Sequence, residues 1–252
     1  MCAMIYHYTT ISGLIGIVTR RELWASDCQF LNDGTELKYA RDLFSAEVEK
    51  LNRPSLDDGG YMVAGSHLYS FRVFIACFCE ESDLLSQWRG YGADQGYALG
   101  FDTEKLKALD FGDIYPVQYG IANPSEYFAK ELSWATEPTA HPGNVDWFES
   151  QKLLPRLARV KHLSFAEERE WRILRQIPEF ALKDQRPKIQ YRPSSMGPIP
   201  YLVMSFTPDC LREVVIGPGS HTETRENAVQ VMLRNLDLQN VNIRISKIPF
   251  RR

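Results

Sequence analysis

Two short apolar runs, Val73 to Cys79 and Tyr97 to Phe101, enclose the part of the chain that is densest in polar and aromatic residues. Both runs are rich in residues that favour β-strands, and each is bounded by Gly or charged residues. This pattern predicts two buried strands with a polar connection between them.

The connection, Ser86 to Gly96, has the composition of a binding loop. Its side chains include Gln87, Trp88, Arg89 and Tyr91, which stand beside three glycines. Glycine lets the backbone turn sharply and come close to a ligand. A structural interpretation is equally open from this segment alone, because Trp88 and Tyr91 would then cover a core and Arg89 would form an ion pair.

Composition excludes several classes of protein. The chain has 252 residues and a formal net charge of −3, so it is not a polycation that coats nucleic acid. Its five cysteines lack the spacing of a disulfide framework and favour a reducing cytosol. No stretch resembles a signal peptide or a membrane span. We therefore expect a cytoplasmic protein that does not associate with membranes.

The chain opens with a strand followed by a helix. Met4 to Tyr8 is short, aromatic and rich in β-formers, and Thr9 and Thr10 are candidate caps for a helix that runs through Val18. His7 lies at the end of the strand, beside Thr9. A lone histidine is often structural, but strand ends and helix N-termini also bind polar and anionic ligands. His7 and Thr9 are therefore candidate ligand contacts.

The rest of the chain alternates strands and helices in no regular order. Asn32 and Asp33 are expected to begin a helix, and Pro54 to Gly65 and Lys183 to Pro200 are expected to form loops or a hairpin. The expected strands are Glu22 to Ser26, Ile114 to Tyr119, a strand within Phe165 to Leu174, Tyr201 to Phe206, Glu213 to Ile216 and Val241 to Ile248, and the expected helices are Glu36 to Leu51, Thr103 to Leu109 and Glu223 to Leu236.

This order of elements predicts the fold class. Short strands outnumber the helices, and the regular βαβ alternation of a doubly wound sheet is missing. We expect one α+β domain over residues 1–252, with a bent or split, mostly antiparallel sheet and flanking helices. Residues 121–162 carry aromatic and apolar positions at helical spacing and are expected to form a helical insertion.

A pair of glutamates marks a second candidate site. Alternation along a strand would place Glu168, Glu170 and Arg172 on the same side. Two carboxylates that point the same way are costly together unless a cation or a ligand lies between them. The alternative is an exposed edge strand whose glutamates pair with arginines.

One basic group precedes these glutamates, and it consists of Lys152, Arg156, Arg159, Lys161 and His162. A run of charges usually forms a solvated helix face. If the group instead lies near a binding cleft, it would suit a phosphate backbone.

Several separated motifs together resemble one bacterial family, catalogued as domain of unknown function 2971. They are Tyr6-His7-Tyr8-Thr9, Leu31-Asn32-Asp33, Leu85 to Gly92, Glu168 to Arg172, Ile216-Gly217-Pro218 and Ser246 to Arg251. They occur in one order over almost the whole chain. The family name itself says nothing about chemistry.

A wider resemblance is more informative. The order His-x-Thr on a first strand, an aromatic-bearing strand and a later strand that starts with Glu is similar to ADP-ribosyltransferases of the His-Tyr-Glu type, in which a split sheet holds NAD in a cleft. The resemblance implies that His7 bonds the nicotinamide-side ribose with help from Thr9. It implies that Tyr97 or Tyr91 stacks on nicotinamide, that Glu170 is catalytic and that Glu168 is accessory.

The chemistry of the residues agrees with these roles. Cleavage of the glycosidic bond of NAD generates positive charge on the sugar, which a carboxylate stabilises. Arg89 is suited to pair with the pyrophosphate, and the neighbouring Gln87 and Trp88 would complete the cofactor-binding set. The expected partners are NAD and a macromolecular acceptor, with nucleic acid ahead of protein. A toxin or a phage-defence effector is the expected biological setting.

Two other function classes stay open. A hydrolase or nuclease would use Glu168, Glu170 and His7 around a metal ion, with Asp33, Asp83 or Asp102 completing the ligand set. A non-enzymatic module would sense a nucleotide in the same cleft. Cys77 and Cys79 have no Cys or His cluster near them in sequence, so we expect them to be core residues rather than metal ligands.

Overall fold

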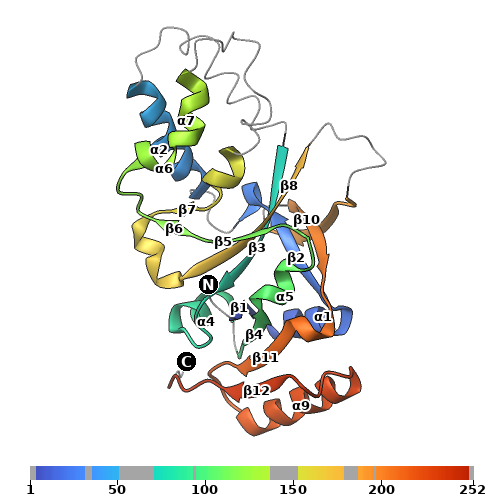
Figure 1. Ribbon diagram of the computed structural model, residues 1–252. Helices are drawn as coiled ribbons and strands as arrows, with labels where there is room; N and C mark the ends of the chain where they lie inside the picture. The colour runs from blue at the N-terminus through green and yellow to red at the C-terminus, as the bar shows by residue number, and fades with distance from the viewer. Residues whose placement is uncertain are drawn as a thin grey trace.

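The computed structural model describes residues 4–31, 36–50, 71–92, 95–136, 153–178, 187–195 and 197–249. Over these ranges the chain is α+β, with an open and mostly antiparallel sheet and several helices (Figure 1). The strands are β1 (Met4–Thr9), β2 (Glu22–Asp27), β3 (Phe71–Cys79), β4 (Tyr97–Asp102), β5 (Asp113–Pro116), β6 (Gln118–Tyr119), β7 (Val160–Lys161), β8 (Glu170–Pro178), β9 (Gln190–Ser194), β10 (Gly197–Ser205), β11 (Leu211–Ile216) and β12 (Asn242–Ile245).

The helices lie between these strands. The α-helices are α1 (Ile11–Arg20), α2 (Glu36–Lys50), α4 (Leu85–Tyr91), α5 (Thr103–Lys107), α6 (Pro124–Tyr127), α7 (Ala129–Thr136) and α9 (Thr222–Asn235), and the short 3-10 helices are η1 (Cys28–Phe30), η3 (Leu163–Glu168) and η5 (Pro208–Cys210). None of the helices within the described ranges combines the length and the apolar character needed to cross a membrane.

The large sheet has the strand order β12-β11-β4-β1-β3-β2-β10-β9, with β8 paired to β3 and β5 paired to β8. β11 and β12 are parallel, and the other pairs in this sheet are antiparallel. A second, small sheet joins β6 and β7 in parallel. The expected class, α+β with a mostly antiparallel sheet, is confirmed.

The sheet divides along one edge of β3. On its other edge, β3 pairs with β8 over its full length. On the divided edge, β2 pairs with β3 at Phe74 and Ile75, whereas β1 pairs with it at Cys79. Beyond these points β1 continues beside β4 and β2 continues beside β10. The two strands therefore separate near Cys77, which leaves an opening in the sheet.

Alternate residues of β3 face two different environments. Phe74, Ala76 and Phe78 belong to the largest hydrophobic cluster, while Ile75 and Cys77 line a cavity on the opposite face. This is the two-residue period of a strand. One face of the sheet therefore forms the core, and the other is available for a site.

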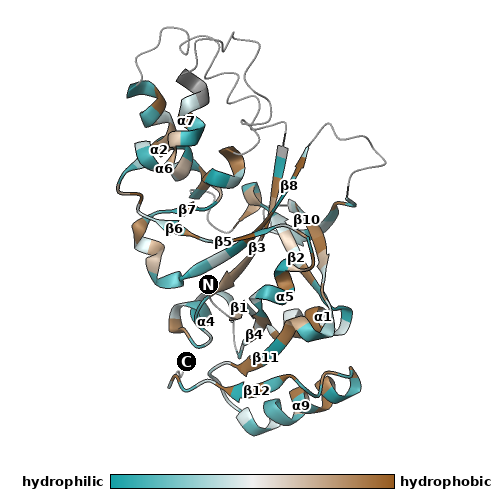
Figure 2. Cartoon of the chain, in the orientation of Figure 1, coloured by the Kyte–Doolittle hydropathy of each residue, from teal (hydrophilic) through white to brown (hydrophobic). Residues whose placement is uncertain are grey.

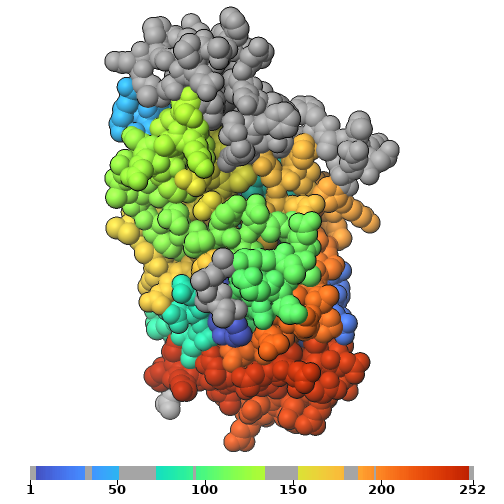
Figure 3. Space-filling model, in the orientation of Figure 1, coloured from blue at the N-terminus to red at the C-terminus, as the bar shows by residue number. Residues whose placement is uncertain are grey.

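The main core joins two helices to the sheet. α1 contributes Leu14 and Val18, and α9 contributes Val229 and Leu233. Thr10 caps α1 by accepting a hydrogen bond from the backbone N–H of Gly13. Hydrophobic residues are prominent along central strands such as β3 and β11 (Figure 2). α9 and β12, near the C-terminus, form one end of the molecule (Figure 1 and Figure 3).

A second core lies in a helical group formed by α2, α6, α7 and the helical residues 153–157. Phe44 of α2 packs edge to face on Phe128, and Leu153 and Leu157 belong to the same cluster. The expected helical segment within 121–162 is therefore packed against a helix from the N-terminal part of the chain. Its residues 137–152 lie outside the described ranges.

Several expected elements differ from the structure. Ser86 to Gly96 was expected to be a loop, but α4 occupies most of it because Gln87 and Trp88 are buried and anchor a helical turn. The expected strand Ile114 to Tyr119 is two short strands, β5 and β6. Lys183 to Pro200, by contrast, contains the β9–β10 hairpin, which is one of the two forms expected there. The expected loop Pro54 to Gly65 and the capping residues Asn32 and Asp33 lie outside the described ranges.

Asp83 anchors α4 to the C-terminal segment. Its carboxylate accepts hydrogen bonds from Trp88 Nε1 at 2.8 Å, from Ser246 Oγ at 2.6 Å and from the backbone N–H of Lys247 at 2.8 Å.

We expect Asp83→Ala to lower the free energy of unfolding by about 1–3 kcal/mol in urea denaturation, because three donors lose their acceptor. The control Glu80→Ala, at an exposed position, should change it by less than about 0.5 kcal/mol. Equal effects would contradict the anchoring role.

Candidate functional site

A cavity of about 780 Å³ lies where β1 and β2 separate. Its walls come from β1, α1, β2, β3 and β8, together with Tyr91 of α4, Glu36 of α2 and Lys161 of β7. The volume is within the range of about 300–1,000 Å³ in which small-molecule sites fall. The division of the sheet thus creates the candidate site.

His7 fills part of the opening in the sheet. Its Nδ1 lies 2.9 Å from the backbone oxygen of Cys77, the β3 residue at the point of separation. A carbonyl oxygen can only accept, so Nδ1 carries the proton. Burial lowers the pKa of His7 and keeps the ring neutral, which leaves Nε2 as an unprotonated acceptor.

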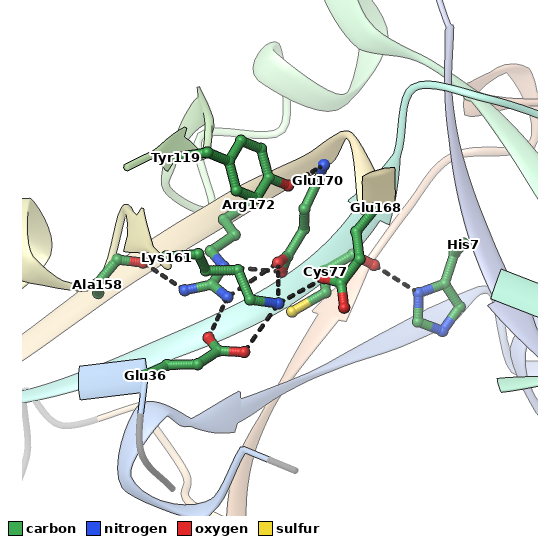
Figure 4. Close-up of polar contacts among 9 residues, drawn as sticks. All are labelled: His7, Glu36, Cys77, Tyr119, Ala158, Lys161, Glu168, Glu170 and Arg172. Atoms are coloured by element: carbon green, nitrogen blue, oxygen red, sulfur yellow. Dashed lines mark hydrogen bonds and ion pairs between the residues drawn. The ribbon is translucent and has the colours of Figure 1, made fainter. Parts of the chain in front are cut away.

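Five charged side chains form a connected cluster at one end of the cavity (Figure 4). Lys161 Nζ contacts Glu36 at 2.8 Å, Glu168 at 2.5 Å and Glu170 at 2.9 Å. Arg172 donates through Nε and Nη2 to both oxygens of Glu170, at 2.7 and 2.9 Å, and through Nη2 to Glu36 at 2.6 Å. Three carboxylates thus share two cations, which gives a formal charge of −1.

The backbone around the glutamates departs from the expected strand. Glu168 ends η3, Glu170 begins β8, and Arg169 between them has a φ of 43° in the left-handed region. The backbone N–H of Glu170 donates to Tyr119 Oη at 2.8 Å. The two carboxylates nevertheless converge, because both reach the same ammonium group of Lys161.

The two glutamates have opposite electrostatic properties. Burial alone would raise the pKa of Glu170, but Arg172 and Lys161 outweigh it and lower the pKa from 4.5 to about 2. Burial raises the pKa of Glu168 above its usual value, although its bond to Lys161 acts in the other direction. Glu170 is therefore held firmly ionised, and Glu168 gains a proton more readily.

The structure brings together some of the expected site residues. His7, Thr9, Tyr91, Glu168 and Glu170 all line the cavity. They come from three segments far apart in sequence, so the fold is what unites them. Gln87 does not line this cavity, but it lines a smaller recess beside it.

Three other expected cofactor contacts lie elsewhere. Trp88 is 3 % exposed and packs edge to face on Tyr8 in a separate hydrophobic cluster. Tyr97 is 2 % exposed in the main core, with its hydroxyl 3.4 Å from Nε of Arg225. Arg89 is exposed on α4 and is not part of the cavity lining. Of the two tyrosines expected to stack on nicotinamide, only Tyr91 lines the cavity.

The carboxylates named for a metal site are separated or already paired. Asp83 anchors α4 as described above, Asp102 caps α5, and Asp33 lies outside the described ranges. The ammonium group of Lys161 lies between Glu168 and Glu170, the position for which a cation or a ligand was expected. Within the described residues, no group of three or more His, Cys, Asp or Glu side chains is arranged to hold a metal ion.

The expected basic surface is not formed as a unit. Lys161 is 3 % exposed and belongs to the charged cluster. Arg156 is half-buried over the ring of Tyr127, and Arg159 is half-buried over the ring of Tyr115. The expectation that this basic group forms a solvated or phosphate-binding face is therefore wrong for Lys161. Lys152 lies outside the described ranges.

Lys161 and Glu36 belong to the site but were not predicted from the sequence. Lys161 was assigned to a run of surface charges, and Glu36 to the first turn of an amphipathic helix. Their burial was the missing information: their side chains are only 4 % and 10 % exposed. The β6–β7 pairing, which carries Lys161 inward, involves only two residues of each strand and has no sequence signal.

The lowered pKa of Glu170 predicts acid sensitivity. A carboxylate with a depressed pKa stabilises the fold fully above its unfolded pKa of about 4.5, and this contribution is lost as the pH falls toward 2. We expect roughly 3 kcal/mol to be lost over this window. Glu168 contributes with the opposite sign because its pKa is raised.

Urea denaturation between pH 5 and pH 2 tests this expectation. Glu170→Gln should be less stable than the wild type at pH 5, and the difference between the two proteins should shrink as the pH falls. A constant difference across the whole range would show that the ionisation of Glu170 contributes nothing to stability.

Part of the chain matches the model of a known protein family. The model of a family described as Protein of unknown function (DUF2971) matches residues 87–173. This part of the chain includes Tyr91, Lys161, Glu168, Glu170 and Arg172 but neither His7 nor Glu36. No curated protein and no solved structure matches the chain. The resemblance to ADP-ribosyltransferases thus rests on the residues alone, and the match supports similarity to the DUF2971 family.

Proposed function

We propose that the protein is an NAD-dependent ADP-ribosyltransferase that modifies a macromolecule. The observation that carries this proposal is the cavity at the division of the sheet, which His7, Tyr91 and Glu170 line together. A neutral hydrogen-bond acceptor, an aromatic ring and an ionised carboxylate around one space suit the nicotinamide ribose of NAD.

The distribution of charge along the cavity agrees with this substrate. The end at β8 carries the cluster with a formal charge of −1. The other end of the cavity is lined by residues of β2 and β9. There Arg192 of β9 contacts Ser26, and Arg20 lies over the ring of Trp24. The two arginines at this end outnumber its single glutamate, Glu22. NAD has a cationic pyridinium ring and an anionic diphosphate, which match these two ends respectively.

Glu170 is suited to the catalytic role. Positive charge develops on the ribose as the bond to nicotinamide breaks, and an ionised carboxylate stabilises it. Arg172 and Lys161 hold Glu170 in one orientation through three hydrogen bonds. Lys161 and Arg172 also weaken the electric field of the Glu170 carboxylate. The proposed mechanism therefore includes the excess negative charge that Glu36 and Glu168 supply.

His7 and Tyr91 position the substrate in this proposal. Nε2 of His7 accepts a hydrogen bond from a ribose hydroxyl, since Nδ1 is occupied by the Cys77 carbonyl. The ring of Tyr91 packs on nicotinamide. Glu168, whose pKa is raised, is placed to take the proton released by the acceptor nucleophile.

The matched pair Glu170→Gln and Glu36→Gln tests the catalytic role. Each substitution removes a carboxylate that contacts both Lys161 and Arg172, so both disturb the cluster in a similar way. We expect Glu170→Gln to reduce nicotinamide release roughly a hundredfold or more with little change in NAD affinity. Glu36→Gln should lower turnover far less, because it removes only the excess negative charge of the cluster and leaves the Glu170 carboxylate in place.

Calorimetry of NAD binding and assays of nicotinamide release separate the alternatives. Equal losses of turnover in both variants would mean that only the charge of the cluster matters. Wild-type turnover in Glu170→Gln would refute the assignment. NAD binding by the wild type without any turnover would favour a nucleotide-sensing module.

The acceptor is nucleic acid or protein in this proposal, and the setting is a toxin or phage-defence effector. The burial of Lys161 removes the main argument for a phosphate-binding surface, so the two acceptors rank equally. Incubation of the protein with lysate and labelled NAD should produce labelled macromolecules. Nuclease should release the label if the acceptor is nucleic acid, and protease should release it if the acceptor is protein. The Glu170→Gln variant is the control.

A further inference from the structure

A recess of about 60 Å³ opens beside the large cavity. The recess is a side chamber of the candidate site, because it shares six lining residues with the cavity: His7, Tyr8, Cys77, Tyr91, Glu168 and Glu170. Its volume is enough for a few water molecules or for one small polar group of a ligand. Its own walls are completed by Tyr6, Phe78 and Gln87.

Gln87 is the unusual residue of this chamber. It is 7 % exposed, and across the described ranges no hydrogen bond pairs its side-chain amide. The amide atoms are not sealed from solvent, and Gln87 lines the recess, so the amide is free to hydrogen-bond a group placed there. Gln87 and Tyr91 are four residues apart on α4, so they share one face of the helix. The amide therefore lies beside the ring proposed to contact nicotinamide.

Resting on the function proposed above, we infer that Gln87 recognises the carboxamide group of nicotinamide. The side-chain amide of glutamine offers two donors and a carbonyl acceptor in one plane. A primary carboxamide is complementary to it, since each group can donate to the other's oxygen. Gln87 thereby fixes the orientation of the nicotinamide ring against Tyr91.

The charges around the chamber favour a neutral group. Glu168 and Glu170 both border it, and Glu170 is held ionised by Arg172 and Lys161. A carboxylate in place of the carboxamide would lie next to this negative charge and would be repelled. The chamber therefore discriminates nicotinamide from nicotinic acid as well as from analogues that lack the amide nitrogen.

The experiment compares NAD with its 3-acetylpyridine analogue, in which a methyl group replaces the amide NH₂. We expect the wild type to prefer NAD in kcat/KM by roughly tenfold or more, because the analogue leaves the Gln87 oxygen unpaired. Gln87→Met has a side chain of similar length without hydrogen-bonding groups and should lose most of this preference. Gln87→Asn, which is too short to reach, should behave in the same way.

A second measurement does not depend on turnover. Calorimetry with free nicotinamide should show binding to the wild type that weakens roughly tenfold or more in Gln87→Met. Binding of ADP-ribose, which lacks nicotinamide, should be the same in both proteins. Gln190→Met is the matched control: Gln190 accepts a hydrogen bond from Tyr201 on β10 and borders neither space, so both measurements should be unchanged.

The outcomes separate this inference from the proposed function. If the wild type turns over NAD and its analogue equally well, the inference is wrong and the transferase assignment stands. The same conclusion follows if Gln87→Met keeps the full wild-type preference and nicotinamide affinity. If the wild type neither binds nor cleaves NAD, the proposed function fails and the inference fails with it.

Discussion

The sharing of two buried cations by three carboxylates is the interaction on which the site depends. Arg172 and Lys161 are only 2 % and 3 % exposed, and a buried charge is tolerated only when it is paired and hydrogen-bonded. Each of the two cations contacts more than one carboxylate, and the guanidinium of Arg172 also donates to the carbonyl of Ala158 at 2.6 Å. The cluster therefore joins β8 to β7, α2 and the end of the helical segment 153–157.

The opening in the sheet is the second requirement. Strand backbones normally satisfy each other's polar groups, and a division of the sheet leaves groups of the continuous strand without a strand partner. Here the imidazole of His7 supplies the bond that a neighbouring strand would have made to Cys77. One side chain thus serves both the backbone of β3 and the wall of the cavity. Because His7 has both roles, its place in the sequence is compatible with a structural residue and with a ligand contact.

Features that depend on local pattern could be predicted from the sequence. Apolar runs gave β3 and β4, and the spacing of Glu168 and Glu170 indicated two carboxylates with a cation or a ligand between them, although the strand alternation used for that prediction is absent at Glu168. Features that depend on long-range burial could not be predicted. The glycines near Trp88 suggested a loop, whereas burial of that indole makes the segment helical. Lys161 looked like one surface charge among several, because nothing local indicates that β6 and β7 pair.

The sequence separations within the site bear on when it forms during folding. Arg172 and Glu36 are 136 residues apart, and His7 and Cys77 are 70 residues apart. Contacts of this range form only after the entropy of closing long loops has been overcome. A chain still being synthesised lacks β8, and with it Glu170 and Arg172, until about two thirds of its 252 residues have been made. The charged cluster can therefore form only after the first two thirds of the chain have been made, and shorter chains lack it.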